Sequence, residues 1–361
     1  MGQGAGRAGR GETALTIPTH SRRKSKYDPR SVPEGERLAT SAMIASLDSE
    51  GRETVSAPFG HALVDLAKTR EDIVGLSADL SKYTDLHVFA KAHPDRFYQM
   101  GMAEAVLMSA AAGLAREGFT PFATTYAVFA SRRAYDFIAM AIAEENLPVK
   151  ICCALPGLTT GYGPSHQATE DLAIMRGMPN LTVIDPCDAV EIDQATRVIA
   201  ETPGPVYMRL LRGQVPDVLG RYGYRFQLGK AQTIRDGSDV LFISSGFMTM
   251  RVLDAAEALA RDGVSCAVLH SPTIKPLDAE TIAAEARKGG RLVVTAENHS
   301  VTGGLGEAVA GALMRAGVHV PFHQIALPDE YLDAGALPTL HEQYGLSVDS
   351  ITARVKTWLE G

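Results

Sequence analysis

The feature that most constrains the fold of this chain is the alternation, from residue 53 onwards, of short apolar segments with longer segments of helical spacing. In the first half, strands are predicted at 73–79, 96–99, 120–126, 149–154, 181–184 and 206–209, and helices at 54–67, 84–92, 105–117, 127–144, 172–178 and 189–201. Strands that alternate with helices in this way predict a mostly parallel, doubly wound α/β sheet with right-handed crossovers.

A second α/β unit is predicted after residue 237. Its strands are expected at 240–244, 265–270 and 291–295, and its helices at 248–262, 278–289, 304–316 and 347–360. Before it, glycine, proline, arginine and tyrosine interrupt any periodicity, which is typical of a linker. The predicted organisation is therefore a disordered extension at 1–52, a first domain at 53–215, a linker at 216–237 and a second domain at 238–361. The extension is assigned from its glycine, arginine, serine and proline content.

The overall composition excludes several classes of partner. A net charge of -7 argues against a nucleic-acid surface. No apolar run approaches the length of a membrane span, and the first residues lack the pattern of a secretory signal. Cys152, Cys153, Cys187 and Cys266 show neither metal-ligand spacing nor a C-x-x-C motif, so we expect buried free thiols in a reducing cytoplasm. These observations favour a cytoplasmic protein without a nucleic-acid or membrane partner and without a metal of its own.

A single carboxylate, Glu104, opens the predicted helix 105–117, which consists largely of alanine and aliphatic residues. A helix that is apolar nearly all round is expected to be buried between layers or between subunits. The residues leave two interpretations of Glu104 open. It is either an ordinary first-turn acid that favours the helix dipole, or a partly desolvated acid that gives or shares a proton.

Ligands of open α/β sheets bind beyond the carboxyl ends of the strands. The polar residues predicted there are Asp79, Glu104, Thr124 to Tyr126, the glycine-rich loop 157–166 with Tyr162 and His166, and Arg209 with Arg212. His166 is either an exposed loop histidine or a placed acid–base group. Arg209 and Arg212 are either surface charges or a phosphate clamp. Tyr126 and Phe129 fit a core as well as a site. The glycines at 303–306 favour a tight turn into a helix over a phosphate loop.

Several motifs follow one another in an order that resembles the transketolase family. They are Asp79, Gly-Met-Ala-Glu104, Pro-Phe-Ala-Thr-Thr-Tyr-Ala-Val-Phe129, Gly-Pro-Ser-His166-Gln and Met-Pro-Asn-Leu-Thr-Val-Ile-Asp-Pro186, with 273–278 and 297–306 further on. The resemblance covers about residues 53–350. It implies the pyrimidine-binding domain and the C-terminal domain of that family, without the diphosphate-binding domain and its Gly-Asp-Gly metal motif. The chain thus resembles the C-terminal subunit of a split transketolase.

The resemblance implies roles by matched position. Glu104 would hydrogen-bond the aminopyrimidine ring of thiamine diphosphate, the cofactor that acts as electron sink. Phe129 would stack on that ring, Tyr126 would lie beside it, and Asp79 would be an acid near the cofactor and the subunit contact. His166 would contact substrate oxygens, Arg212 with Arg209 would hold a sugar phosphate, and Tyr162 would line the substrate site. A separate N-terminal subunit would supply Mg²⁺ and the diphosphate site in an assembly such as α2β2, in which this chain also pairs with its own copy.

Two departures from the family pattern bear on the substrate. Ala105-Val-Leu follows Glu104 where the family has Gln-Asn, and Tyr162 stands where the family loop carries an aspartate that reads a sugar hydroxyl. A less hydroxylated or aromatic-tolerant substrate is therefore expected. The predicted activity is transfer of a two-carbon ketol unit from a ketose to an aldehyde. The alternatives are the β subunit of a 2-oxoacid decarboxylating or acyloin-forming enzyme, a 1-deoxy-D-xylulose-5-phosphate synthase-like activity, and a non-catalytic assembly subunit.

Overall fold

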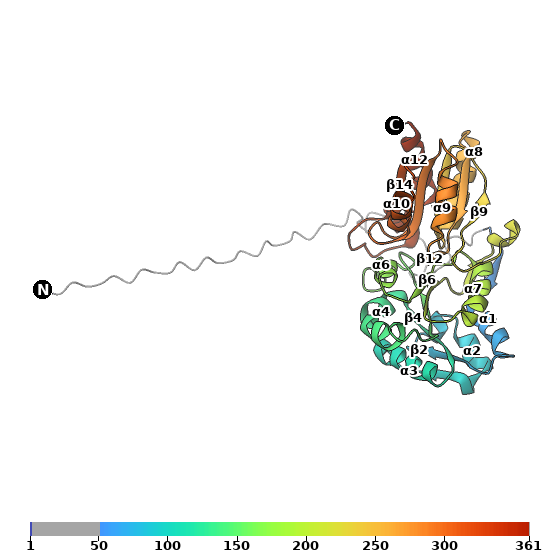
Figure 1. Cartoon of the computed structure of the whole chain (residues 1–361), viewed down its shortest axis with the longest axis vertical. Coiled ribbons are helices and arrows are strands. Elements are labelled where there is room, and N and C mark those ends of the chain that lie inside the picture. The colour runs from blue at the N-terminus through green and yellow to red at the C-terminus, as the bar shows by residue number, and fades with distance from the viewer. Residues whose placement is uncertain (2–50, 361) are drawn as a thin grey trace, which may run out of the picture. The chain divides into compact units, whose positions relative to one another are not determined.

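The computed structural model describes Met1 and residues 51–360 (Figure 1). The extension predicted at 1–52 lies outside the described residues, apart from its first residue and its last two. Within the described range the strands assemble into two large sheets and one two-stranded ribbon. This arrangement confirms the predicted α/β class with two doubly wound halves.

The first sheet is parallel except for one edge strand. Across the sheet, its strands are β12 (Thr273–Lys275), β6 (Thr182–Ile184), β7 (Val206–Leu210), β5 (Lys150–Ala154), β4 (Thr120–Tyr126), β2 (Ile73–Ser77) and β3 (Phe97–Gln99). The antiparallel strand is β12, which pairs with β6 although it comes from the second half of the sequence. The interior strands β2, β4, β5 and β7 are buried along their whole length, as expected of a parallel sheet that is covered on both faces.

Helices cover both faces of this sheet (Figure 1). One face carries α1 (Pro58–Ala67), α2 (His87–Ala92) and α7 (Ala189–Glu201); the other carries α3 (Glu104–Arg116), α4 (Ala127–Arg133), α5 (Tyr135–Ile138), the π-helical turn η4 (Ala139–Ala143) and α6 (Asp171–Arg176). The neighbours Cys152 and Cys153 point into these two different cores, because successive side chains of a strand face opposite sides. Short 3₁₀ turns lie at η2 (Ser81–Tyr83), η3 (Pro94–Arg96) and η5 (Leu219–Tyr222).

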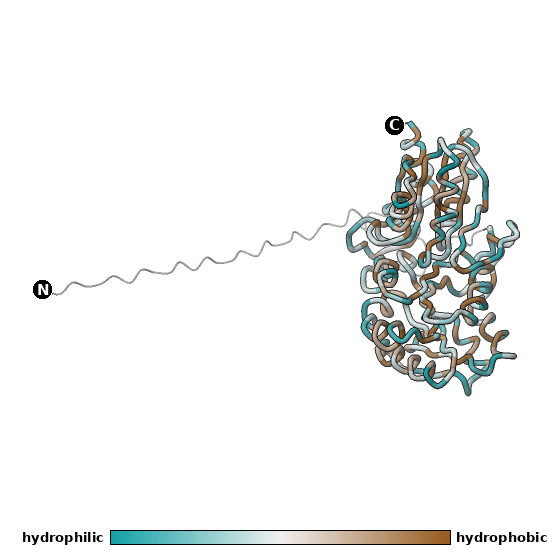
Figure 2. The backbone as a smooth tube through the Cα atoms, viewed as in Figure 1, coloured by the Kyte–Doolittle hydropathy of each residue, from teal (hydrophilic) through white to brown (hydrophobic). Residues whose placement is uncertain are grey.

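The second sheet has the order β14 (Phe322–Leu327), β13 (Leu292–Ser300), β10 (Val240–Ser244), β11 (Cys266–His270) and β9 (Gln232–Arg235), with only β9 antiparallel. Its helices are α8 (Met248–Arg261), α9 (Ala279–Ala286), α10 (Leu305–Arg315), α11 (Leu337–Gln343) and α12 (Val348–Glu360). Figure 2 shows brown, apolar stretches along the inner strands of both sheets and teal, hydrophilic stretches on the peripheral turns. The apolar residues form two buried clusters, each of which includes residues from both halves.

Three element predictions were wrong in detail. The helix predicted from residue 54 begins only at Pro58, whose fixed φ suits a first helical turn, and β1 (Thr54–Ser56) precedes it and pairs with β8 (Gln214–Pro216). The predicted linker 216–237 contains β9, a full member of the second sheet. The long helix predicted at 127–144 is interrupted at Ala134 and continues as α5 and a π-helical turn.

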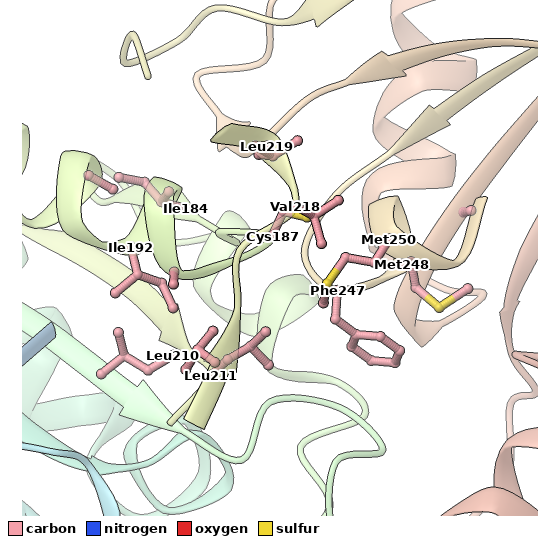
Figure 3. Packing of buried hydrophobic residues seen from close by; sticks show 14 of the residues in the cluster. Ile184, Cys187, Ile192, Leu210, Leu211, Val218, Leu219, Phe247, Met248 and Met250 are labelled. Atoms are coloured by element: carbon pink, nitrogen blue, oxygen red, sulfur yellow. The ribbon is translucent and has the colours of Figure 1, made fainter. Parts of the chain in front are cut away.

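An apolar junction connects the two halves (Figure 3). Ile184, Cys187 and Ile192 from the first half belong to one continuous buried cluster with Phe247 and Met250 of the second half. All four cysteines are buried free thiols, as predicted. In the part of the chain that the structure describes, no helix has both the length and the apolar character needed to cross a bilayer.

Candidate active site

The turn that leads into Glu104 is fixed by the side chain of Gln99, at the end of β3. Its Oε1 accepts a hydrogen bond from Asp79 N at 2.7 Å and another from Gly101 N at 3.4 Å. Gly101 has a φ of 70°, which glycine adopts without strain. Glu104 is then the first residue of α3, and only 4% of its surface is exposed. A carboxylate thus lies beneath the surface at the carboxyl edge of the first sheet.

The carboxylate of Glu104 is paired with Arg133, a residue that the sequence did not single out. Arg133 Nη1 lies 3.3 Å from Glu104 Oε1 and 3.5 Å from Oε2. The same guanidinium lies over the ring of Phe129, with its carbon 3.9 Å from the ring centroid. Phe129 and Arg133 are four residues apart on α4, so the helix places both on one face. A planar cation therefore occupies the space between a buried acid and an aromatic face.

Aromatic rings converge on His166 from three different segments. The centroid of His166 lies 5.3 Å from that of Phe129, 6.2 Å from that of Tyr126 and 5.4 Å from that of Tyr162. Tyr126 ends β4 and is 5% exposed, whereas 43% of Tyr162 is exposed. The structure thus brings Tyr126, Phe129, Tyr162 and His166 together, next to Glu104.

His166 is held on one side by its own loop. Its Nδ1 lies 2.9 Å from Ser165 Oγ, and its backbone N–H donates to Gly163 O at 3.0 Å. Partial burial lowers the pKa of the His166 imidazole, and the positive charge of Arg133 lowers it further. The ring is accordingly neutral at pH 7 and offers one donor and one acceptor nitrogen.

The other end of the cluster carries Arg212 and two tyrosines. The guanidinium carbon of Arg212 lies 5.6 Å from the ring centroid of Tyr83. Burial raises the pKa of Tyr126, while the charge of Arg212 opposes that rise. Asp79, with a φ of 60°, follows β2, and its side chain is exposed. Tyr83, like Arg133, was missed by sequence reasoning, because a tyrosine in a short turn gives no periodic signal.

The prediction that Arg209 holds a substrate phosphate was wrong. Arg209 is 1% exposed, and its guanidinium bonds both carboxylate oxygens of Asp171, with Nε at 2.9 Å from Oδ2. It also lies 3.4 Å from Asp185 Oδ2. The family pattern places this arginine near a phosphate, but its two acidic partners come from distant segments of the first half. These buried acids neutralise Arg209, so it serves as a structural centre at the junction of the two sheets.

The glycine run at 303–306 forms a turn into a helix, as the sequence favoured. The N-terminal N–H groups of α10 are occupied by Glu297, whose carboxylate accepts from Leu305 N at 2.6 Å and from Gly306 N at 2.7 Å. A Cβ on Gly304 would lie 1.9 Å from Glu297 Oε2, so only glycine allows this approach. An acid of the chain itself therefore fills the place that a phosphate would take at this helix end.

The site at Glu104 has the chemistry of a binding place for a flat, protonatable ring. It offers a buried carboxylate, an aromatic face and, next to that aromatic ring, a neutral imidazole. Such a set can hold a heteroaromatic group by stacking and by one hydrogen bond to a ring nitrogen, and it can exchange a proton with that group.

The comparisons with known proteins define the class of protein first. Residues 53–217 match the family model described as the transketolase pyrimidine-binding domain, and residues 229–351 match the transketolase C-terminal domain. The first half of the chain is thus a pyrimidine-binding domain, and the second half is a transketolase C-terminal domain. The chain belongs to the transketolase family, and the resemblance noted in its motifs is confirmed.

Relatives of similar length point to a particular section of that family. A transketolase family protein of Sinorhizobium fredii is 66% identical over 94% of this chain and 99% of its own length. A transketolase C-terminal section of Methanocaldococcus jannaschii is 38% identical over 82% of this chain and 93% of its own length. A solved structure described as a split gene transketolase, inactive beta4 tetramer, is 41% identical, with a TM-score of 0.76 over 86% of this chain and 99% of that chain. The chain thus corresponds to the C-terminal section of a split transketolase.

A further set of relatives is named for a different activity. The 1-deoxy-D-xylulose-5-phosphate synthase of Syntrophotalea carbinolica is 34% identical over 86% of this chain, which spans 49% of that protein. These enzymes and the transketolases share a dependence on thiamine diphosphate, which is therefore a property of the family to which the chain belongs.

Proposed function

We propose that this chain is the C-terminal subunit of a two-chain, thiamine diphosphate-dependent transketolase that moves a two-carbon ketol unit from a ketose to an aldehyde. The observation that carries the proposal is the arrangement of Glu104 and Phe129, a buried carboxylate beside an aromatic face. A family resemblance alone would not require these two side chains to be near each other, because they lie on different helices.

The residues present fit the aminopyrimidine part of the cofactor. The Arg133 guanidinium makes the two contacts that such a ring requires, since it pairs with Glu104 and covers the face of Phe129. A guanidinium is planar and positively charged, so it stands in for a flat ring with a protonated nitrogen. More than half of the Arg133 side chain is exposed, which lets it move aside when the ring enters.

When bound, thiamine diphosphate supplies the electron sink on which two-carbon transfer depends. Glu104 would hold a proton at the ring nitrogen that it contacts, and its burial would exclude competing water from that bond. Phe129 would support the face of the ring, and Tyr126 would close the pocket beside it. Asp79, on the turn fixed by Gln99, would lie at the edge of the cofactor and of the subunit contact.

Substrate recognition would fall to the loop and to Arg212. A neutral His166 can accept a proton from a substrate hydroxyl with one nitrogen, while Ser165 fixes the orientation of the ring. Arg212 would bind the phosphate of a sugar phosphate. Tyr162 presents an aromatic side chain where an acid would bind a sugar hydroxyl, so we expect an acceptor with fewer hydroxyl groups near this position.

A separate N-terminal subunit would carry Mg²⁺ and the diphosphate site, in an assembly such as α2β2. Apolar side chains flank Glu104 on an outer face of this chain: Met102 is 81% exposed, Val106 54%, Met140 58% and Phe137 41%. Helix α3 was predicted to be apolar all round, but only one side of it is covered by the first sheet. Relatives named as a C-terminal section and as a split gene product support the existence of a second chain, and this apolar face is where we propose that it binds.

The second candidate is a 1-deoxy-D-xylulose-5-phosphate synthase-like reaction, which the relatives named as such synthases favour. The two candidates differ in the donor. Release of carbon dioxide from pyruvate in the presence of an aldehyde would identify the synthase-like reaction, whereas transfer from hydroxypyruvate or a ketose phosphate without consumption of pyruvate would identify the transketolase.

The proposal is tested by Glu104→Gln in the complex with the N-terminal subunit. With hydroxypyruvate as donor and glyceraldehyde 3-phosphate as acceptor, we expect turnover to fall by at least about 100-fold, because a positioned acid contributes on that scale. Size-exclusion chromatography should show unchanged assembly. Glu145→Gln is the matched control, since Glu145 pairs with Arg116 on the surface. Unchanged turnover in Glu104→Gln would refute the assignment.

A further inference from the structure

Residues of the second half of the chain form hydrogen bonds with the loop that carries the site residues Tyr162 and His166. This loop follows β5, and its neck is closed by Gly157 N, which donates to Ala168 O at 3.0 Å. Backbone groups of Pro156 and Leu158 are bound by residues after position 297, more than 130 residues further along the sequence. The substrate loop of the first half is therefore shaped by the second half.

The side chain of Asn298 forms hydrogen bonds with the backbone on both sides of Gly157. Its Oδ1 accepts from Leu158 N at 2.9 Å, and its Nδ2 donates to Pro156 O at 3.1 Å. Gly157 has a φ of 55°, and a Cβ there would lie 2.2 Å from the backbone oxygen of Asn298. Glycine at position 157 thus allows the backbone of Asn298 to come this close to the backbone of the loop.

His341, on α11, fixes the next carbonyl of the loop. Its Nε2 lies 2.7 Å from Leu158 O, and because a carbonyl oxygen can only accept, Nε2 carries the proton. Nδ1 faces Arg251 Nη2 at 3.4 Å. Burial lowers the pKa of the His341 imidazole to about 3, with the charge of Arg251 acting in the same direction. The ring is neutral, stacks on Phe247 with centroids 5.5 Å apart, and remains in a single tautomer.

The segment before α11 holds the outer part of the loop. Gly335 N donates to Gly161 O at 3.0 Å, directly before Tyr162. Gln167, directly after His166, donates from Nε2 to Asp333 O at 3.1 Å. A Cβ placed on Gly163 would lie 3.3 Å from the Cβ of Ala334, so these two residues are close together. The two substrate-facing residues are thus bracketed by backbone contacts with 333–335.

We propose that Asn298 and His341 are positioning residues for the aldehyde substrate, acting through the loop 156–167 on Tyr162 and His166. This gives the C-terminal domain a part in substrate recognition in addition to its part in the fold. The inference rests on the proposed function, because it takes Tyr162 and His166 to face the substrate. Asn298 and His341 bind the loop at 156–158 and, in the part of the chain that the structure describes, form no hydrogen bond with Glu104 or its helix, so cofactor binding should change less than acceptor binding.

The test uses the assembled two-chain enzyme with Mg²⁺, thiamine diphosphate, hydroxypyruvate as donor and glyceraldehyde 3-phosphate as acceptor. Asn298→Ala and His341→Leu should each raise the KM for the acceptor by about tenfold, which is the scale expected when one or two hydrogen bonds to the loop are lost. The apparent dissociation constant of thiamine diphosphate should change by less than about twofold. Hydrogen exchange of 156–167 should become faster in both variants.

Two further variants separate positioning from general destabilisation. Ser245→Ala removes another buried hydrogen bond between the two halves, to Asp185 at 2.9 Å, but does not touch the loop. It should leave the acceptor KM and the loop exchange unchanged. His341→Gln retains an N–H at a similar reach and should restore most of the affinity lost in His341→Leu.

The possible results distinguish this inference from the function on which it rests. An unchanged acceptor KM in Asn298→Ala and His341→Leu, or an equal rise in Ser245→Ala, would overturn the inference. The companion variant His166→Asn tests the function itself. If His166→Asn raises the acceptor KM while the positioning variants do not, only the inference fails. If His166→Asn also has no effect, the proposed substrate site is wrong.

Discussion

Replacement of Arg133 by methionine should tighten the binding of thiamine diphosphate. The guanidinium of Arg133 contacts both the carboxylate of Glu104 and the ring of Phe129, and the proposed position of the aminopyrimidine ring requires it to leave both. The free energy of these two contacts therefore opposes cofactor binding. Methionine retains the length of the side chain without its charge, so the packing of the aliphatic stem is disturbed least.

The magnitude follows from the exposure of the two partners. Glu104 is almost buried, but 55% of the Arg133 side chain is exposed, so solvent screens the ion pair and we assign it about 1 kcal/mol. A partly exposed cation–π contact adds about 0.5–1 kcal/mol. Together they oppose binding by about 1.5–2 kcal/mol, and their loss should lower the apparent dissociation constant of thiamine diphosphate by about 10-fold to 30-fold.

The measurement is calorimetric titration of the two-chain enzyme with thiamine diphosphate at saturating Mg²⁺. Arg116→Met serves as control, because Arg116 lies on the neighbouring helix α3 and pairs with Glu145 on the surface. The dissociation constant of this control should equal that of the wild type. A dissociation constant that is unchanged or raised in Arg133→Met would refute the reasoning, and a raised value would mean that Arg133 contacts the bound cofactor.

Two further predictions concern the buried charges. Arg209→Leu leaves Asp171 and Asp185 buried without their cation, so the free energy of unfolding should fall by about 3–5 kcal/mol in urea denaturation; a loss below about 1 kcal/mol would contradict the structural role of Arg209. Burial raises the pKa of Glu297 from 4.5 to about 7. Between these two pH values the folded chain retains a proton that the unfolded chain has released. The free energy of unfolding therefore falls as the pH rises, and this contribution is lost once the pH has passed about 7. Compared with Glu297→Gln, the wild type should therefore lose up to about 3 kcal/mol of unfolding free energy between pH 5 and pH 8. A difference that does not vary with pH would show that Glu297 is ionised throughout.

The fold was predictable where a segment carries its own signal. Strands β2, β4, β5 and β7 are continuous apolar runs, because both faces of a parallel sheet are buried, and such runs are legible in a sequence. Strand β9 was missed because its residues, Gln232–Arg235, are only half-buried and three of the four are polar or charged. Strand β1 is exposed and exists only through its pairing with β8, some 160 residues away.

The candidate site was predictable in its residue types but not in its pairings. The motifs drew attention to Glu104, Tyr126, Phe129 and His166, and the fold brings these four together. Arg133 had no comparable signal, because its partner Glu104 lies on another helix, although its spacing from Phe129 could have indicated a shared face. Arg209 was misassigned since its acidic partners become its neighbours only when the chain folds.

Strand β12 has a consequence for how the two halves can be separated in evolution. It belongs by sequence to the second half, yet it completes the edge of the first sheet by pairing with β6. A gene division or domain exchange placed at the predicted linker would remove this strand and leave the backbone groups of β6 open to pairing with other chains. The two halves are therefore not cleanly separable at that linker, and a division there would have to carry a substitute for the missing edge strand.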